Sequence, residues 1–554
     1  MNNNDLTFIS IGGIGDVTKN MYAYIVGNEI LLVDCGIGFA DSNLPGVDLL
    51  IPDISYLKTQ IASGKKIVGM LLSHGHEDHI GALPFILPQL PKFPIYGSTL
   101  TAALSNAKLT EFGLGSLVSE VLFTDKSLNL GVFNVSFIRM THSILDTANI
   151  VIRTSVGSFY HGSDFKFDFT PVDGNTSDLQ SIAAAGRDGI MCLMSDCLGA
   201  ERHGHSRSEA QISSSFEEEF RKTKGKIIVT TYSSNISRLN QAIDEGLKAG
   251  RKICFMGRSL LKARDIGRTL NYMNFPKKYE IKPHDIGRYK PSEVLLLVAG
   301  SQAQEFSALT RIANNDDRDI RIEKGDTVIF SADPIPGNEE NIYALIDTIT
   351  KRGAKVVYSD ITDEFHVSGH GSENDLKLLI SLTNPKYMVP IGGTFRQMVR
   401  YREIAKDMGY PEDDVYLLDS GQEVHFSKNG VRYGKKVPSA SIFLDQVTRE
   451  EIENYVVIDR VRIAKEGVMI VMVELNSQSG QIEGTPTVLT KGFVYDKKDE
   501  LEKNLGITFT QRFANRNEPV TAIGYYKKTI EKATEEVLYK EGRSPLVVPV
   551  IIEV

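Results

Sequence analysis

The stretch SHGHEDHIG occupies residues 73–81, at the end of an apolar strand predicted over residues 67–73. His74 and His76 are two residues apart, so on an extended backbone their side chains point to the same side. Asp78 and His79 follow at the turn into a predicted helix, so this loop can present two groups of ligands to two adjacent metal ions. Imidazole and carboxylate suit zinc, and also manganese or iron. A polar surface turn is the alternative interpretation, but histidine is only 11 of 554 residues, so a chance grouping is rare.

Two metal ions need more ligands than this loop provides. His142 follows an apolar strand predicted over residues 133–140, and Asp164 ends another over residues 158–164. Each residue alone is more typical of an ordinary surface or core position. Each closes a strand with a short polar turn, however, where the metal ligands of β-rich enzymes can converge. Asp164 has two carboxylate oxygens and could bridge two ions.

Strands dominate the first third of the chain. Two apolar runs around Gly27-Asn28 predict a β-hairpin. Further strands are predicted over residues 149–156 and 190–196, and a helix over residues 77–90. Many strands with few helices between them indicate an antiparallel or mixed sheet with helices packed on its faces.

The pattern changes near Ser208. Strand and helix alternate over residues 226–360, which indicates a parallel α/β domain. After His370 a single βα unit follows, and we expect it to return to the first domain. From about residue 446, two strands and a helix over residues 525–542 predict a small α/β domain at the end of the chain.

Composition limits the function classes. The 554 residues carry a net charge of −8, which argues mildly against a protein that coats nucleic acid but allows a local basic channel. The four cysteines form no Cys-x-x-Cys pair and fit a reducing compartment. The N-terminus lacks a signal-peptide pattern and no apolar run approaches about 18 residues. We therefore expect a soluble cytoplasmic protein with no membrane partner.

Two other motifs have weaker support. The glycines of GGIG, residues 12–15, invite a dinucleotide-binding interpretation, but Thr18 stands where a third glycine is required. His203 and His205 repeat the His-x-His spacing within the polar stretch ERHGHSRSE, which favours a solvated loop.

The His-x-His-x-Asp-His signature resembles that of the metallo-β-lactamase superfamily. The wider pattern is similar to its β-CASP branch and, within it, to the ribonuclease J family. The segments that carry this resemblance are GGIGDVTKNMY (12–22), VDLLIPDISYL (47–57), SHGHEDHIGALP (73–84), DFKFDFTPVDG (164–174), GDTVIFSADPIPGNE (325–339), HVSGHGSENDLKLL (366–379) and the C-terminal VPVIIEV.

The resemblance implies an α/β fold: a metallo-β-lactamase αββα sandwich with an inserted parallel α/β β-CASP domain and a small α/β C-terminal domain. The implied boundaries place the first part of the metallo-β-lactamase domain at 1–210 and its second part at 371–445. The β-CASP domain would span 211–370, and a C-terminal oligomerisation domain 446–554.

The resemblance also implies roles for residues. His74, His76, His142 and Asp164 would hold one divalent metal ion, and Asp78, His79 and Asp164 a second. Zinc is expected, with manganese as the alternative. A water bridging the ions would be the nucleophile, with Asp78 among the catalytic residues. Asp196 would orient His370, which would protonate or stabilise the leaving 3′ oxygen. His366, Val367, Ser368, Gly369 and His370 would cradle RNA phosphates. For Asp196 the alternative is a strand-end helix cap, and for 366–370 a glycine-rich turn without ligand.

The chain departs from the family pattern at three places. Gly392 stands where the family has its last metal-binding histidine, so the second site loses one ligand and is expected to be weak. Residues 299–305, AGSQAQE, differ from the family's TGSQGEP, and Ser237 stands where histidine is frequent. These changes bear on the level of activity more than on the fold.

Three functions were compared. The leading one is a metal-dependent ribonuclease, a 5′→3′ exonuclease with some endonuclease activity in RNA processing, maturation and mRNA decay. It would act on single-stranded RNA as a homodimer or homotetramer through the C-terminal domain. The alternative is a weakly active or inactive paralogue that binds RNA as the structural partner of an active ribonuclease J subunit. A small-molecule hydrolase is disfavoured by the insertion and the HVSGH segment.

Overall fold

The computed structural model describes residues 5–40, 44–125, 127–335, 338–359, 365–445, 448–495, 497–514, 520 and 522–554. The chain divides into two compact units, Met1–Phe39 with Leu50–Ser441, and Ala40–Leu49 with Ile442–Val554. The end of the strand predicted over 354–360, part of segment 325–339 and the boundary near 446 lie outside the described residues. In the described ranges, no helix is long and apolar enough to cross a membrane.

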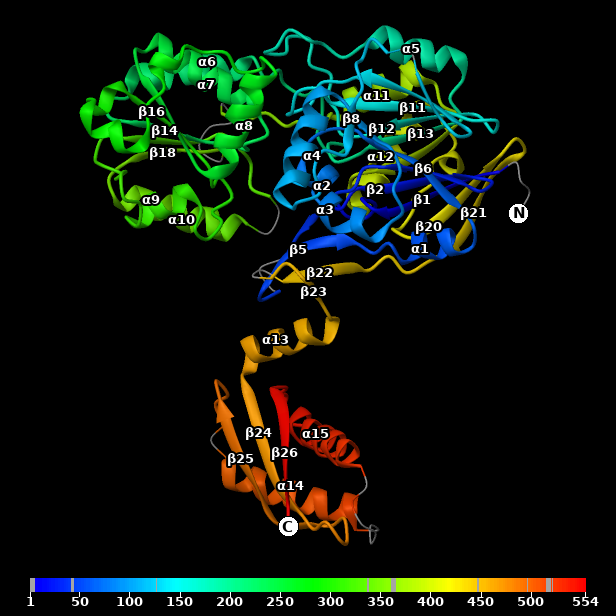
Figure 1. Cartoon of the computed structure of the whole chain (residues 1–554), viewed down its shortest axis with the longest axis vertical. Coiled ribbons are helices and arrows are strands. Elements are labelled where there is room, and N and C mark those ends of the chain that lie inside the picture. Colours follow the sequence, from blue (N-terminus) through cyan, green and yellow to red (C-terminus); the bar gives the residue numbers. More distant parts are fainter. Residues whose placement is uncertain are drawn as a thin grey trace. The chain divides into compact units, whose positions relative to one another are not determined.

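Two β-sheets form the centre of the first unit, as Figure 1 shows. The eight-stranded sheet has the order β21-β20-β1-β2-β3-β6-β7-β8. Its strands are β21 (Gly430–Lys436), β20 (Gln422–Ser427), β1 (Leu6–Gly12), β2 (Met21–Val26), β3 (Glu29–Val33), β6 (Lys66–Leu72), β7 (Ile95–Gly97) and β8 (Val118–Glu120). Antiparallel β2 and β3 form the predicted hairpin around Gly27-Asn28. Strands β3, β6, β7 and β8 then pair in parallel, which makes this a mixed sheet.

The second sheet has six strands in the order β19-β13-β12-β11-β10-β9. These are β19 (Tyr387–Ile391), β13 (Cys192–Asp196), β12 (Ser158–Gly162), β11 (Ala148–Arg153), β10 (Phe133–Arg139) and β9 (Leu128–Leu130). Strand β19 pairs in parallel with β13, so the late βα unit returns to the first domain as predicted. Both sheets contribute to one buried core, with Phe8 and Tyr24 from one and Ile150 and Phe159 from the other.

Helices cover the outer faces of this sandwich. On the six-stranded sheet these are α5 (Leu179–Asp188), α11 (Glu373–Thr383) and α12 (Phe395–Asp407), whose apolar sides join the same core. On the eight-stranded sheet, α4 (Thr99–Glu111) packs against β7 and β8. Helix α1 (Ser55–Ala62) contacts β20, since the Tyr56 hydroxyl donates to Oε1 of Glu423 at 2.8 Å. The prediction of one helix over residues 77–90 is wrong, because the structure has three short helical pieces there. These are α2 (Glu77–Ile80), α3 (Leu83–Ile86) and a 3₁₀ turn, Leu87–Gln89, because Gly81 and two prolines interrupt a continuous helix.

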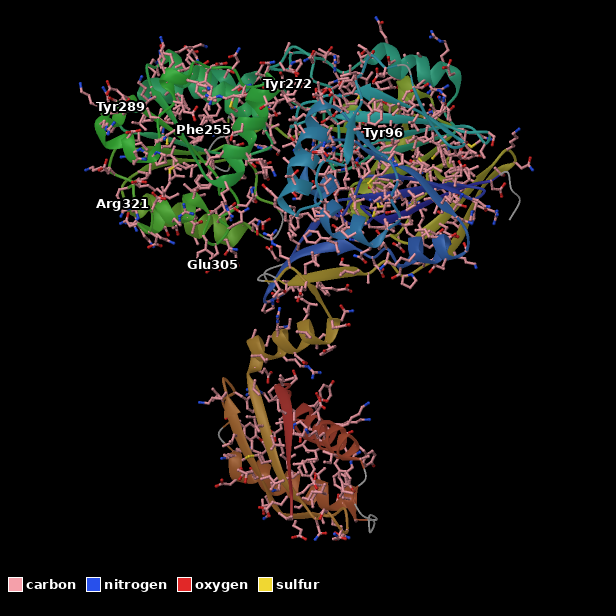
Figure 2. The ribbon with its side chains drawn as sticks, viewed as in Figure 1. Tyr96, Phe255, Tyr272, Tyr289, Glu305 and Arg321 are labelled. Atoms are coloured by element: carbon pink, nitrogen blue, oxygen red, sulfur yellow. The ribbon has the colours of Figure 1, made fainter. Side chains whose placement is uncertain are left out.

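The insert, residues 211–357 as described, is the predicted parallel α/β region. Its five-stranded sheet has the order β15-β16-β14-β17-β18, and all its pairs are parallel. The strands are β14 (Ile227–Thr230), β15 (Lys252–Met256), β16 (Val294–Val298), β17 (Thr327–Phe330) and β18 (Lys355–Val357). Figure 1 shows α6 (Gln211–Lys222), α7 (Ile236–Lys248) and α8 (Arg258–Thr269) on one face, and α9 (Ala308–Asn314) and α10 (Glu339–Lys351) on the other. Buried apolar side chains fill both faces, and Phe255, labelled in Figure 2, lies in the core under α6, α7 and α8.

The second unit contains a three-stranded sheet in the order β25-β24-β26. Its strands are β24 (Val468–Leu475), β25 (Ile482–Lys491) and β26 (Leu546–Glu553). Helices α14 (Lys498–Phe513) and α15 (Ile523–Tyr539) pack on one face of this sheet, and α13 (Asn454–Glu466) precedes it. The predicted strands 469–476 and 545–554 and the helix over 525–542 correspond to β24, β26 and α15. The other boundaries predicted from the resemblance stay predictions.

Candidate metal centre

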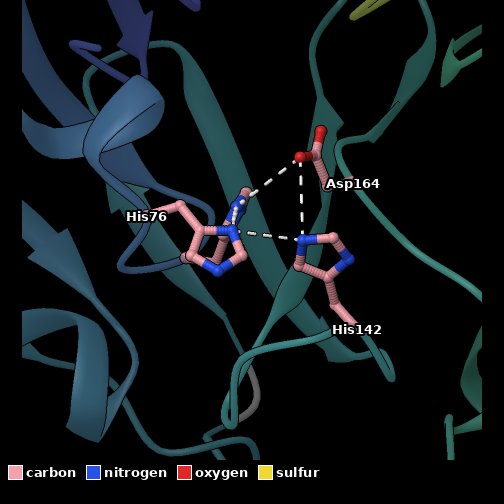
Figure 3. Close-up of side chains that lie close together, drawn as sticks. His76, His142 and Asp164 are labelled. Carbon is pink, nitrogen blue, oxygen red and sulfur yellow. Dashed lines mark hydrogen bonds and ion pairs between the residues drawn. The ribbon is translucent and has the colours of Figure 1, made fainter. Parts of the chain in front are cut away.

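The first predicted ligand set lies together in the structure. The loop after β6 carries His74 and His76, the loop after β10 carries His142, and the turn after β12 carries Asp164. Nδ1 of His76 lies 3.1 Å from Nε2 of His74 and 3.2 Å from Nε2 of His142. Oδ2 of Asp164 lies 3.7 Å from Nε2 of His74 and 3.7 Å from Nε2 of His142. Figure 3 shows His76, His142 and Asp164 pointing toward one another. Tetrahedral zinc with bonds of about 2.0–2.1 Å separates its ligand atoms by roughly 3.4 Å, so this donor set fits a cation.

The second set adjoins the first and shares Asp164 with it. Nε2 of His79 lies 3.4 Å from Oδ2 of Asp78 and 3.4 Å from Oδ2 of Asp164. In each of the two sets the donor atoms lie within 4.8 Å of one another. The geometry therefore has room for two adjacent cations that share one carboxylate.

A third group links the same carboxylate to His370. Nδ1 of His370 lies 2.8 Å from Oδ2 of Asp196, which ends β13. Nε2 of His370 lies 3.9 Å from Oδ2 of Asp164. The Asp196 contact leaves Nε2 directed into the centre, which is the arrangement expected from the resemblance. Oδ1 of Asp196 also accepts a hydrogen bond from the Leu198 backbone N–H at 2.8 Å, so the cap-like contact and the His370 contact use different oxygens of one carboxylate.

Buried residues that sequence reasoning missed orient the ligands. Asp34, after β3, accepts a hydrogen bond from the Ser73 backbone N–H at 2.7 Å, and its Oδ2 lies 2.8 Å from Nδ1 of His79. Asp34 has φ of +60°, a left-handed conformation that directs its carboxylate into the loop. The carbonyl oxygen of Gly369 lies 2.7 Å from Nδ1 of His142. Such outer contacts fix the orientation of metal-binding histidines.

Asn20 is a further missed residue beside the second set. Its Nδ2 lies 3.3 Å from Oδ2 of Asp78 and 3.1 Å from Nε2 of His79. Tyr22 holds the amide by donating a hydrogen bond to its Oδ1 at 2.8 Å. The only signal in the sequence was the position of Asn20 within segment 12–22, which carried the family resemblance.

Burial controls the protonation of the ligand imidazoles. Desolvation lowers the pKa of His76 to about 4, and it lowers the pKa values of His74 and His142 well below the usual range. At His79, burial acts in the same direction, but the carboxylates of Asp164, Asp78 and Asp34 outweigh it and raise the pKa. Neutral imidazoles offer the lone pairs that metal ligation requires.

At Asp164 and at His370, nearby opposite charges outweigh the effect of burial, whereas burial raises the pKa of Asp196. Burial opposes ionisation of Asp164, but His79 and His370 outweigh it and hold its pKa well below the usual range. At His370, burial lowers the pKa, and the negative charges of Asp196 and Asp164 overcome it and raise the pKa to about 9. A protonated His370 can donate a proton from Nε2 near neutral pH.

Gly392 lies at the centre, where the missing histidine was expected. It follows β19 with φ of +64°, and its N–H donates to the Gly13 carbonyl at 2.7 Å. A Cβ placed on Gly392 would lie 3.8 Å from Oδ1 of both Asp164 and Asp196. A side chain at this position would therefore face the shared carboxylate.

The predicted substrate segment, 366–370, lies beside the ligands. Nε2 of His366 lies 3.1 Å from Oδ2 of Asp333, and Val367 is buried. The Ser368 hydroxyl accepts from the His370 N–H at 3.1 Å. A Cβ on Gly369 would lie 2.7 Å from the His142 ring, so this position requires glycine.

A cavity lies between the loop that carries His142, the residues that follow Asp164 and the start of the insert. Its walls include Arg139, His142 and Asp168 from the sandwich, with Glu209 and Ser237. One of the departures from the family pattern, Ser237, is therefore a wall residue of this cavity.

The remaining His-x-His pair is separate from the centre. The ring of His203 is exposed and contacts Glu373 at 2.9 Å, and His205 contacts Asp375 at 3.2 Å. Residues 201–205 are exposed, as expected for a solvated loop, whereas Glu209 at the end of this stretch is buried. The glycine-rich residues 12–15 join β1 to the loop before β2, so no helix follows them.

Family models match four parts of the chain. They are the Metallo-beta-lactamase superfamily at residues 14–188, the Ribonuclease J beta-CASP domain at 224–349, the Zn-dependent metallo-hydrolase RNA specificity domain at 354–418 and the Ribonuclease J C-terminal domain at 455–554. Fold and site thus define a metallo-β-lactamase-type hydrolase, a class that binds divalent metal ions.

Comparison with individual proteins narrows the class. Ribonuclease J2 of Bacillus subtilis (strain 168) is 33% identical, with 100% of this chain and 99% of that one covered. Ribonuclease J 1 of Streptococcus pyogenes serotype M3 is 35% identical, with 99% and 98% covered. Ribonuclease J of Thermus thermophilus is 35% identical, with 98% and 95% covered. The chain belongs to the ribonuclease J family, which supports metal-dependent ribonuclease chemistry and RNA binding.

The fold also occurs among solved structures. A protein of unknown function from Enterococcus faecalis V583 has a TM-score of 0.53 and 15% sequence identity, with 76% of this chain and 100% of that chain covered. At this identity the likeness concerns the fold alone.

Asp34→Asn is expected to weaken metal binding about 10–100-fold, because His79 loses the carboxylate that orients it. Chelator competition with zinc and with manganese measures the affinity, and elemental analysis of the unmodified protein should find at least about one ion per chain. Asp326→Asn is the matched control, since Asp326 is also buried and accepts backbone N–H groups, but within the insert. Equal affinities in the two variants would contradict the role of Asp34.

Proposed function

We propose that this chain is a 5′→3′ exoribonuclease with some endonuclease activity, acting on single-stranded RNA in the cytoplasm, in RNA processing, maturation and mRNA decay. The observation that carries the proposal is the convergence of three side-chain groups on Asp164: two ligand sets and the His370–Asp196 pair. A hydrolase that cuts a phosphodiester needs charge neutralisation at the phosphate and a proton for the leaving oxygen, and these groups can supply both.

The residues divide the task between them. His74, His76, His142 and Asp164 would hold one divalent cation, and Asp78, His79 and Asp164 the other, with zinc or manganese as the metal. When bound, the cations supply electrostatic stabilisation of the phosphate and lower the pKa of the attacking water. Asp196 keeps Nε2 of His370 directed at the substrate, so that this nitrogen can protonate the leaving 3′ oxygen. The 366–370 segment would receive the RNA phosphates.

RNA with a 5′-monophosphate is expected to decay faster than the same RNA with a 5′-triphosphate. The expected reason is size and charge, because a 5′-triphosphate carries two more phosphate groups than the single phosphate that we propose the 366–370 segment receives at this end. The assay follows both RNAs, labelled at the 5′ end, with added zinc or manganese, and a chelator-treated sample is the control. Equal decay of the two RNAs, with products from internal sites only, would contradict the preference.

Gly392 favours a second candidate function, the weakly active or inactive paralogue that supports an active subunit. The second cation would have only Asp78, His79 and Asp164 as protein ligands. Under this alternative the chain binds RNA and joins a ribonuclease J partner without substantial cleavage of its own. Under the leading function, activity recovers when metal is abundant.

Gly392→His is expected to lower the metal concentration for half-maximal cleavage about 10-fold or more, because it restores an imidazole beside Asp164. The left-handed φ of +64° opposes the change by about 1–2 kcal/mol, and thermal melting with and without metal separates strain from ligation. Gly250→His is the control. Gly250 also has a left-handed φ, of +74°, and open space around it, but it follows the end of α7 in the insert and is not among the residues of the centre. If both variants only lose stability, Gly392 does not stand in a ligand position.

Self-association through the second unit is part of the proposal, with a second copy of this chain as the occupant. Helices α14 and α15 cover one face of the three-stranded sheet. On the other face, Val548, Val550 and Ile552 of β26 and Leu489 of β25 are 37–48% exposed. Two such apolar faces complement each other across a two-fold axis, and so small a sheet gains stability from a second layer. We propose a dimer or tetramer formed in this way.

Val550→Glu is expected to reduce the mass in solution, since it places a charge in the centre of the apolar face. Static light scattering across a dilution series measures this mass for the full chain. Val494→Glu is the control, because Val494 is 75% exposed and lies after β25, off the sheet. An unmodified protein that is monomeric, or a Val550→Glu protein of unchanged mass, would contradict this interface.

A further inference from the structure

Four charged side chains are buried together between the metal-binding turn and the insert. Lys166 and Asp168 follow the ligand Asp164, Glu209 precedes α6, and Arg238 lies in the first turn of α7. Their exposed fractions are 0%, 3%, 4% and 1%. Lys166 Nζ lies 3.3 Å from Glu209 Oε1, and Arg238 Nη2 lies 2.6 Å from Glu209 Oε2. Burying charges costs free energy, so this arrangement calls for a functional reason.

Arg238 connects this cluster to the start of the substrate segment. Its Nη1 donates to the carbonyl oxygen of Phe365 at 2.9 Å and to the Ser331 hydroxyl at 2.6 Å. The Ser331 hydroxyl donates to the same carbonyl at 2.5 Å. The planar guanidinium therefore holds Glu209, Ser331 and Phe365 at once, which a lysine ammonium cannot reproduce.

Four hydrogen bonds fix the short segment from Phe365 to Gly371 at three points. Arg238 and Ser331 hold the Phe365 carbonyl at one end. The Gly371 N–H donates to the Phe165 carbonyl at 2.6 Å at the other end. Between them, the Gly369 carbonyl contacts Nδ1 of His142 at 2.7 Å. His370 lies inside this short segment, so the backbone anchors determine where its ring can reach.

We propose that Arg238 is a positioning residue for His370, acting through the Phe365 carbonyl. The inference rests on the proposed function, in which His370 serves the leaving oxygen. In that reaction the water oxygen forms a bond to phosphorus and releases its proton to solvent. The bond from phosphorus to the 3′ oxygen breaks, and this oxygen takes a proton from Nε2 of His370, which solvent then replaces. Loss of Arg238 would let the segment shift and separate Nε2 from the 3′ oxygen.

The dependence on the leaving group tests this role. RNA releases a poor leaving group that needs a proton, whereas bis(p-nitrophenyl) phosphate releases p-nitrophenolate, which departs without one. A lost or misplaced general acid therefore slows RNA cleavage and spares the activated ester. His370→Ala is the reference and is expected to lower kcat on RNA about 10²–10⁴-fold, with a much smaller loss on the ester.

Arg238→Met is expected to show the same selective loss, about 10-fold or more in kcat on RNA, with a smaller change in KM. Ser331→Ala removes one donor to the same carbonyl without exposing a buried charge, and should show a weaker loss of the same kind. It keeps the test decisive if Arg238→Met does not fold. Arg251→Met is the control, since Arg251 is also buried in the insert and binds the carbonyls of Thr223, Gly225 and Val294, away from the segment.

The possible failures are distinguishable. If His370→Ala slows both substrates equally, the general-acid role in the proposed function is wrong. Suppose that His370→Ala slows RNA cleavage and spares the ester. The positioning role is then overturned if Arg238→Met and Ser331→Ala slow both substrates equally, and also if they slow neither substrate. Selective loss in Arg251→Met would also overturn it, because any loosening of the insert would then have this effect. A wild-type protein that cleaves neither substrate overturns both proposals.

Discussion

A single carboxylate oxygen, Oδ2 of Asp164, lies within 3.4–3.9 Å of ring nitrogens from His74, His79, His142 and His370. This crowding constrains the charge of the whole centre. Four imidazoles in a buried space cannot all be protonated, because like charges at such distances repel strongly. Burial keeps His74 and His142 neutral, while His79 and His370 depend on nearby carboxylates. Neutral imidazoles beside ionised carboxylates form a site that divalent cations complete.

The two-sheet architecture is what allows this convergence. The loop after β6 belongs to the eight-stranded sheet, whereas the ligands after β10 and β12 and the carboxylate at the end of β13 belong to the six-stranded sheet. Strand β19 returns late in the chain and places the Gly392 turn beside β13. The insert leaves between these two strands, so its closing segment carries His370 back to Asp196. Strands β13 and β19, which the insert separates in the sequence, are therefore neighbours in the six-stranded sheet.

Much of this could be predicted from the sequence, because the relevant signals are local. The hairpin at Gly27-Asn28, the alternation in the insert and the ligand loop each depend on neighbouring residues. The continuous helix over 77–90 was wrong because its apolar pattern outweighed Gly81 and the prolines in our interpretation. Asp34 and Arg238 were missed for a different reason. Each resembles an ordinary residue at a strand end or in a helix, and only contacts between distant segments reveal its partners.

The Gly392 turn keeps its backbone geometry without a side chain. The Gly13 carbonyl accepts a hydrogen bond from the Gly392 N–H and lies 3.0 Å from the Tyr22 hydroxyl. That hydroxyl donates to Oδ1 of Asn20 and so holds Asn20 beside Asp78 and His79. None of these contacts involves a side chain at position 392. Because the turn is held by the Gly392 N–H, a glycine at this position preserves the backbone geometry without offering a metal ligand. A side chain here would face both the shared carboxylate of Asp164 and Asp196, since a Cβ at position 392 would lie 3.8 Å from Oδ1 of each.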